Sequence, residues 1–362
     1  MKVLFFGSYD PDYPRNKILR EGLALAGVTV LECNVPFWEG LRFHDRYRRL
    51  LRAVWNIGNG WDVMITPEFN QKNIPLAAPL AAYYRRPLVF DPLVSFYNTN
   101  VEDRQRVGSK GTGAFIQKAW DKTGFLLADN VWADTNEHKK YFHKKFNVSL
   151  KSLDVVPVGA DDDVFSPSPW RGAGREFVVA FLGSYVPLHG VECIMEAALL
   201  LKSEKRIRFK LIGSGQVFDR IKAMRELYAL PNVDMLPSVL YREIPQAMSD
   251  ADVCLGVFGG TDKASRVVPN KVYAALAMRK PVVTGDSPAI REMFEDGVHL
   301  CACKMADPLA LADAIRLLAD SPELRRSLAW QGHEFVMKNF SRKMIGERAK
   351  RILARTVEER NK

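Results

Sequence analysis

Short apolar runs alternate with longer amphipathic stretches along the chain, which is typical of parallel strands joined by crossover helices. In the first half, the apolar runs predict strands at residues 3–6, 28–31, 63–66, 88–91, 130–134 and 153–156. Apolar residues at helical spacing predict helices between them, at residues 17–26, 43–55, 76–83, 116–127 and 137–146.

The same alternation starts again in the second half, after a stretch of turn-forming and acidic residues at 157–169 that we interpret as a linker. Strands are predicted at 177–182, 209–212, 233–236, 253–257 and 281–284. Helices are predicted at 192–201, 218–228, 242–248, 270–278, 309–318, 323–338 and 342–360. We therefore expect two Rossmann-like, doubly wound α/β domains, at 1–165 and 166–340, which face a central cleft. Residues 341–362 should form a helix that packs back on the first domain.

Composition narrows the class of protein. With 47% hydrophobic and 26% charged residues, the chain should fold rather than stay disordered. No run of apolar residues is long enough to span a membrane. The 5 cysteines are odd in number and scattered, which indicates reduced thiols and a cytoplasmic protein. A formal net charge of +10 favours anionic partners, but no nucleic-acid-binding module is visible.

Glycines follow several predicted strands. Gly7 and Ser8 end the first strand, where a glycine allows a tight turn and brings backbone N–H groups toward a ligand; a simple turn is the other interpretation. No G-x-G-x-x-G pattern follows, so a nicotinamide-dependent oxidoreductase is not favoured.

Two similar loops follow strands of the second domain. The first contains Gly183, Ser184 and His189, and Gly190 then begins a helix; the second is Gly213-Ser214-Gly215. A helix N-terminus framed by glycines is suited to bind an anion. The two loops together indicate a nucleotide pocket.

A basic segment leads into the predicted helix at 270–278. It contains Lys263, Arg266 and Lys271, with Pro269 and Asn270 where that helix begins. A cation in the first turn opposes the helix dipole and calls for an anionic partner or for solvent. A diphosphate would satisfy Arg266 and Lys271; a solvated basic loop is the alternative.

Three D-x-D patterns were considered as metal sites, at 10–12, 161–163 and 250–252. None follows directly on an apolar strand, so each is better explained as a turn or a cap. We predict no metal.

The segment at 268–284, V-P-N-K-V-Y-A-A-L-A-M-R-K-P-V-V-T, resembles the donor-site signature of group 1 (family 4) glycosyltransferases, which have the GT-B fold. Residues 181–190 resemble that family's first donor-domain loop, and 155–165 resemble its interdomain crossing. Residues 250–253 and 289–297 also fit the family pattern.

This resemblance implies transfer of a sugar from a nucleotide-diphosphate sugar to a glycan, lipid-linked or protein acceptor, as in polysaccharide biosynthesis. The anomeric configuration would be retained, and no metal or other cofactor would take part. Arg266 and Lys271 would stabilise the leaving diphosphate. Donor-binding residues would be Gly183, Ser184, His189, Gly213, Ser214, Gly215, Lys263, Pro269 and Asn270.

The chain departs from the family pattern in its charged residues. The family's two glutamates, eight positions apart, fall on Arg266 and Ala274, and its loop arginine and lysine fall on Ser184 and His189. An alternative function is therefore a catalytically degenerate relative that binds a nucleotide or glycan as a partner subunit.

On the acceptor side, the candidates are Gly7 and Ser8, from the glycine turn after the first strand, and Asp91, from the resemblance. Asp91 follows the fourth strand near the place of the family's histidine. There it would be catalytic by orienting or deprotonating an acceptor hydroxyl, or would hydrogen-bond the donor sugar; a turn cap is the other interpretation.

The stretch at 42–55 mixes arginines with aromatic residues on a predicted helix. It would suit peripheral contact with the anionic inner face of a membrane, or else an ordinary surface helix.

Overall fold

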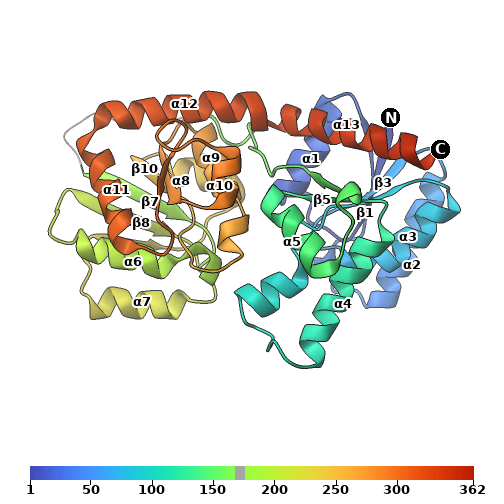
Figure 1. Ribbon diagram of the computed structural model, residues 1–362, viewed down its shortest axis with the longest axis horizontal. Helices are drawn as coiled ribbons and strands as arrows, with labels where there is room; N and C mark the ends of the chain where they lie inside the picture. Colours follow the sequence, from blue (N-terminus) through green and yellow to red (C-terminus); the bar gives the residue numbers. More distant parts are fainter. Residues whose placement is uncertain (168–175) are drawn as a thin grey trace. The chain divides into compact units, whose positions relative to one another are not determined.

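The computed structural model describes residues 1–167 and 176–362, so Ser168 and Pro169 of the expected linker lie outside the described residues. The chain forms two compact units, Met1–Gly159 with Arg342–Lys362, and Ala160–Ser341. Residues 160–165, which the sequence assigned to the first domain, therefore belong to the second unit. Each unit contains one sheet flanked by helices (Figure 1).

The first sheet is entirely parallel, with strand order β2-β1-β3-β4-β5-β6. Its strands are β1 (Lys2–Gly7), β2 (Thr29–Asn34), β3 (Val63–Thr66), β4 (Leu88–Phe90), β5 (Asn130–Ala133) and β6 (Leu153–Val155). The strand order reverses at β1, which lies between β2 and β3. In sheets of this kind, ligands bind outside the carboxyl ends of the strands at such a reversal.

The helices of the first unit come from both ends of the chain. They are α1 (Pro14–Leu25), α2 (Phe43–Ile57), α3 (Ile74–Tyr83), α4 (Thr112–Leu127), α5 (Asn136–Phe146) and α13 (Arg342–Arg360). Short helical turns are η1 (Phe37–Glu39), η2 (Gln71–Asn73), η3 (Asn98–Asp103) and η4 (Leu150–Ser152). One core cluster joins Leu4, Met64 and Phe90 of the sheet to Val54 of α2 and Phe125 of α4.

The second sheet is also entirely parallel, with strand order β12-β11-β10-β7-β8-β9. Its strands are β7 (Phe177–Leu182), β8 (Ile207–Ile212), β9 (Val233–Leu236), β10 (Val253–Leu255), β11 (Val282–Gly285) and β12 (Cys301–Cys303). The order reverses between β7 and β10, so a ligand of this unit is expected beyond the carboxyl ends of those two strands.

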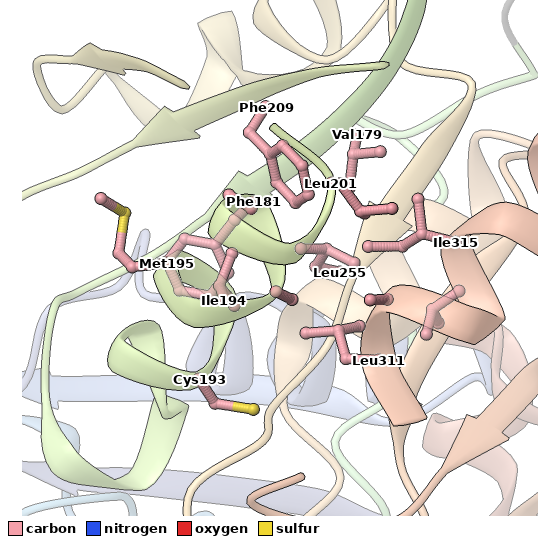
Figure 2. Packing of buried hydrophobic residues seen from close by; sticks show 14 of the residues in the cluster. Val179, Phe181, Cys193, Ile194, Met195, Leu201, Phe209, Leu255, Leu311 and Ile315 are labelled. Carbon is pink, nitrogen blue, oxygen red and sulfur yellow. The ribbon is translucent and has the colours of Figure 1, made fainter. Parts of the chain in front are cut away.

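The helices of the second unit are α6 (Val191–Leu200), α7 (Phe218–Leu227), α8 (Ile244–Ala247), α9 (Asn270–Ala277), α10 (Pro288–Met293), α11 (Pro308–Asp320) and α12 (Pro322–Phe340). Short turns are η5 (Pro187–His189), η6 (Tyr241–Glu243) and η7 (Ala264–Arg266). Figure 2 shows part of the core, in which Phe181 and Phe209 of the sheet lie with Ile194 of α6 and Leu311 of α11. In the part of the chain that the structure describes, no helix is both long and apolar enough to cross a membrane.

Sequence patterns did not predict β12 or α10. β12 has 3 residues and α10 has 6, so neither is long enough to display a period of its own. Hydrogen bonding to the rest of the fold decides their conformation instead: β12 pairs with β11, and the side chain of Ser287 caps α10.

The C-terminal helix α13 packs on α1 through two glycines. A β-carbon on Gly346 would lie 1.9 Å from the carbonyl oxygen of Gly22, and one on Gly22 would lie 2.3 Å from the carbonyl oxygen of Arg342. Arg342 also pairs with Glu21 of α1 at 2.5 Å. The first unit therefore depends on backbone-to-backbone contact between the two helices.

Substituting Gly346→Ala should lower the free energy of unfolding of the first unit by about 1–3 kcal/mol, because the added methyl group forces the two helices apart. Gly60→Ala is the matched control, since a β-carbon there meets nothing within 4 Å. The effect is measured by urea unfolding, monitored through hydrogen exchange of the backbone amides of α1. Equal stability of the two variants would show that the glycine contact does not constrain this packing.

Candidate functional site

The loops that leave β7 and β8 lie side by side at the carboxyl edge of the second sheet. Tyr185 N donates a hydrogen bond to Ser214 O at 2.9 Å. A β-carbon on Gly213 would lie 2.0 Å from the carbonyl oxygen of Gly183, so no other residue fits there without displacing that loop. Gly183 and Gly213 both have φ of +147°, which favours glycine. The structure thus brings together the two loops that the sequence predicted to be donor-binding.

His189 belongs to the same group. Its Nδ1 contacts the carbonyl oxygen of Ser184, and its ring meets that of Phe181 edge-on, with centroids 5.8 Å apart. Its own carbonyl accepts a hydrogen bond from Phe258 N at 3.1 Å. The loop after β7 is therefore fixed against the segment that follows β10.

Lys271, in the first turn of α9, extends into this group from the other side of the strand-order reversal. Its Nζ lies 3.8 Å from the centroid of the Phe181 ring, and a β-carbon on Gly183 would lie 2.6 Å from that Nζ. The Nζ is buried and has no hydrogen-bond partner in the structure. Burial lowers the pKa of Lys271 well below its usual range. The face of the Phe181 ring attracts a cation and so offsets part of the cost of a charge on Lys271. A bound anion would supply the negative charge and the hydrogen-bond acceptor that the site lacks.

An apolar pocket lies beside Lys271. Ala274, the position on which the family's second glutamate falls, lines it together with Lys271 and with Leu182, Ile244, Met248, Cys254, Leu255, Ala275 and Met278. No carboxylate is among these residues, so contacts that the family makes through that glutamate would have to come from elsewhere in this chain.

The other predicted donor residues lie on the segments that follow β7, β8 and β10. Pro269 is the N-cap of α9 and Asn270 is its first residue, as the sequence indicated. Lys263 is buried, Arg266 is half-buried on η7, and η7 lies next to α10. Ser184, Ser214 and Gly215 are exposed at the loop tips.

In the first unit, Asn70 positions the loop after β1. Its Oδ1 accepts a hydrogen bond from Ser8 N at 2.7 Å, and a β-carbon on Gly7 would lie 2.3 Å from that oxygen. Sequence reasoning selected Gly7 and Ser8 but missed Asn70. The sequence did carry a signal for such a residue, because T-P-E-F-N at 66–70 places polar residues at the end of the buried strand β3.

Asp91 lies at the end of β4 but is not open to a substrate. It is fully buried, and Arg15 binds both of its oxygens, with Nε to Oδ2 and Nη2 to Oδ1 each at 2.9 Å. Arg15 Nη1 also donates to the carbonyl oxygens of Val156 and Pro157, at 2.8 and 2.7 Å. No sequence pattern marks an arginine of α1 as the buried partner of a carboxylate 76 positions away. The ion pair links α1, β4 and the end of β6.

Comparisons with known proteins agree with this architecture. The profile of the family "Glycosyl transferases group 1" matches residues 176–321. The uncharacterized glycosyltransferase MJ1178 of Methanocaldococcus jannaschii is 24% identical over 241 residues, which cover 63% of this chain and 62% of that protein. The chain spans between 44% and 62% of the length of the curated relatives it matches.

Solved structures match nearly the whole chain. HepE of Anabaena, crystallised with UDP, superposes with a TM-score of 0.74 at 16% identity, over 98% of this chain and 100% of that one. HepE has also been crystallised with UDP-glucose. Sucrose-phosphate synthase of Thermosynechococcus elongatus has a TM-score of 0.75 at 15% identity, over 99% of both chains.

Two parallel six-stranded sheets with these matches define the GT-B fold. The match to the glycosyl transferases of group 1 covers residues 176–321 and lies within the second unit.

Substituting Asp91→Asn should destabilise the first unit by about 3–5 kcal/mol, because it leaves the Arg15 guanidinium buried without its counter-charge. The control Glu39→Gln removes an exposed partner of Arg49, at 2.7 Å, and should cost less than about 1 kcal/mol. Urea unfolding followed by hydrogen exchange in β4 compares the two. An Asp91→Asn protein of unchanged stability would mean that the pair does not hold this part of the unit together.

Proposed function

We propose that this protein transfers a sugar from a nucleoside-diphosphate sugar to a hydroxyl group of an acceptor. The observation that carries the proposal is the buried Nζ of Lys271, which has no hydrogen-bond partner and lies against Gly183 at the strand-order reversal of the second sheet. In a group 1 glycosyltransferase unit, a diphosphate is the anion that such a position calls for.

The proposed catalysis rests on the negative charge of the leaving diphosphate. As the glycosidic bond to the donor breaks, negative charge develops on the leaving diphosphate. A lysine in a water-poor site stabilises that charge more strongly than it would in water. Lys271 would make this contact directly, and Arg266 and Lys263 would add to the positive potential. Asp91 would act by fixing Arg15 rather than by removing a proton, since both of its oxygens are already bound.

Finer features of the proposal come from the resemblance rather than from geometry. They are retention of the anomeric configuration, catalysis without a metal, and a glycan, lipid-linked or protein acceptor in polysaccharide biosynthesis on the cytoplasmic side of a membrane. UDP is the first nucleotide to try, because HepE was crystallised with it. The alternative, a degenerate relative that binds a nucleotide without transfer, is motivated by Ala274, and it predicts UDP binding with no turnover.

Substituting Lys271→Met should weaken UDP binding about 10- to 100-fold, the loss of roughly 1.5–3 kcal/mol expected for a charged hydrogen bond. Calorimetry on the full chain measures this. The matched control is Lys222→Met, which removes the same charge from an exposed position of the same unit. A wild-type protein that binds no nucleoside diphosphate, or full binding by Lys271→Met, would end the proposal.

UDP binding should also take up protons. Because the pKa of Lys271 is low in the free protein and a bound diphosphate favours its charged form, the affinity should fall as pH rises through the pKa of the complex. The binding enthalpy should accordingly depend on the ionisation enthalpy of the buffer. That dependence should disappear in Lys271→Met and persist in Lys222→Met.

A membrane contact would involve α2. Leu50 and Val54 face the core, whereas Arg48, Leu51, Arg52 and Trp55 recur at helical spacing on the exposed side. Trp55 is 74% exposed, and Phe37 and Trp38 of η1 are exposed as well. Arginines beside exposed aromatic and aliphatic side chains are suited to the headgroup region of an anionic bilayer.

The full chain should bind vesicles of phosphatidylglycerol but not of phosphatidylcholine. Arg48→Glu with Arg52→Glu should lower that binding at least about 10-fold, since each basic residue near an anionic surface contributes about 1 kcal/mol. Arg220→Glu with Lys222→Glu makes the same change of charge on α7 and should have little effect. Vesicle sedimentation compares the two double variants. Equal loss of vesicle binding in both would indicate an effect of the protein's net charge alone.

A further inference from the structure

Buried oxygen atoms without partners gather at the strand-order reversal of the first sheet. Ser8 follows β1, Asn16 lies in α1, Thr66 ends β3 and Glu68 follows it; their exposures are 8%, 0%, 0% and 3%. In each of them one side-chain oxygen is buried and has no hydrogen-bond partner. Such atoms are costly, and several at one place require an explanation.

Hydrogen bonds hold these side chains in position. Asn16 Nδ2 donates to Asp10 O at 2.7 Å and to Glu68 Oε1 at 3.2 Å, which leaves Asn16 Oδ1 and Glu68 Oε2 unbound. Asn70 Nδ2 donates to Glu68 O at 2.7 Å, and Asn70 Oδ1 accepts from Ser8 N. The group is therefore ordered before any ligand binds, as a recognition site requires.

The charges around Glu68 determine the pKa of its carboxyl group. Arg15 is already bound by both oxygens of Asp91, so it compensates Glu68 only from a distance. Burial, together with the negative charges of Asp91 and Asp10, raises the pKa of Glu68 well above its usual range, and Arg15 opposes this only in part. Tyr13, the N-cap residue of α1, lies close enough to Glu68 for the two to interact, and burial raises the pKa of the Tyr13 phenol. The protonated form of Glu68 is therefore favoured compared with that of an exposed glutamate.

These features restrict the ligand. Of the unbound atoms, Asn16 Oδ1 can only accept a hydrogen bond, whereas the hydroxyls of Ser8 and Thr66 and a protonated Glu68 can donate as well as accept. The ligand must therefore bring both donors and acceptors. Asp10 and Asp91 repel a phosphate or a carboxylate, and an apolar ligand would leave the oxygens unsatisfied. Hydroxyl groups, which both donate and accept, fit a site of oxygens and one carboxylic acid.

We propose that Glu68 and Asn16, supported by Ser8 and Thr66, bind a hydroxyl group of the acceptor, and that the part of the acceptor held there is an uncharged sugar or polyol. This rests on the proposed function and narrows its acceptor class. Glu68 and Asn16 are then specificity-determining residues of the first unit, separate from the cations of the second.

The test uses the full chain with a panel of neutral methyl hexosides and glycerol, against glucose 6-phosphate and glycerol 1-phosphate. Hydrogen-exchange protection of residues 7–16 and 66–70 reports binding. Neutral probes should protect these segments saturably, and the phosphorylated ones should not. Glu68→Ala should abolish the protection, whereas Glu68→Gln, which stays uncharged and keeps a donor, should retain it.

The pH profile separates this role from a merely structural one. Protection by neutral probes should fall as pH rises through the pKa of Glu68 in the wild-type chain and should stay level in Glu68→Gln. Protection that is equal in Glu68→Ala, equal for phosphorylated probes, or absent for every neutral probe overturns the inference; internal water alone would then explain the oxygens. UDP binding, measured in the same samples, shows separately whether the proposed function stands.

Discussion

The second unit contains a buried amine, Nζ of Lys271, that has no hydrogen-bond partner among the described residues and whose charged form burial disfavours. Placing an ammonium group in a buried position costs several kcal/mol unless a partner repays it. Lys271 receives only the face of Phe181, and Phe181 is itself fixed in the core that joins β7 to α6. Gly183 can have no side chain without striking Nζ, and Gly213 can have none without striking Gly183. The closely packed glycine loops and the buried amine are thus parts of one arrangement, which an anion would complete.

The two units place opposite chemistry at equivalent points of related sheets. Beside the point where strand order reverses in the second sheet, Lys271 offers a buried nitrogen that has no hydrogen-bond partner among the described residues. Where it reverses in the first, the buried atoms without partners at the strand ends are oxygens. In the proposed function, the carboxyl ends of the strands at each reversal would bind an anion in the second unit and hydroxyl groups in the first.

Sequence patterns specified the architecture well, because buried parallel strands read as uninterrupted apolar runs and crossover helices show their period. They also selected Gly183, His189 and Lys271, since glycines at strand ends and a cation in a first helical turn leave local traces. They could not foresee that Arg15 binds Asp91, or that Asn16 reaches Glu68 across 52 positions, because such pairings exist only once strands are adjacent. For the N-terminal loop, the polar residues after β3 were visible in the sequence, but not that Asn70 among them would bind Ser8 N across 62 positions.

The return of α13 to the first unit has a consequence for biosynthesis. Residues 160–341 form the second unit without interruption, so that unit can assemble as soon as its own stretch has left the ribosome. The first unit begins synthesis earlier, yet α1 lacks its packing partner until Arg342–Lys362 has been translated. The part of the protein that is made first is therefore completed last, and in the meantime the bare face of α1 is a surface that a chaperone could shield.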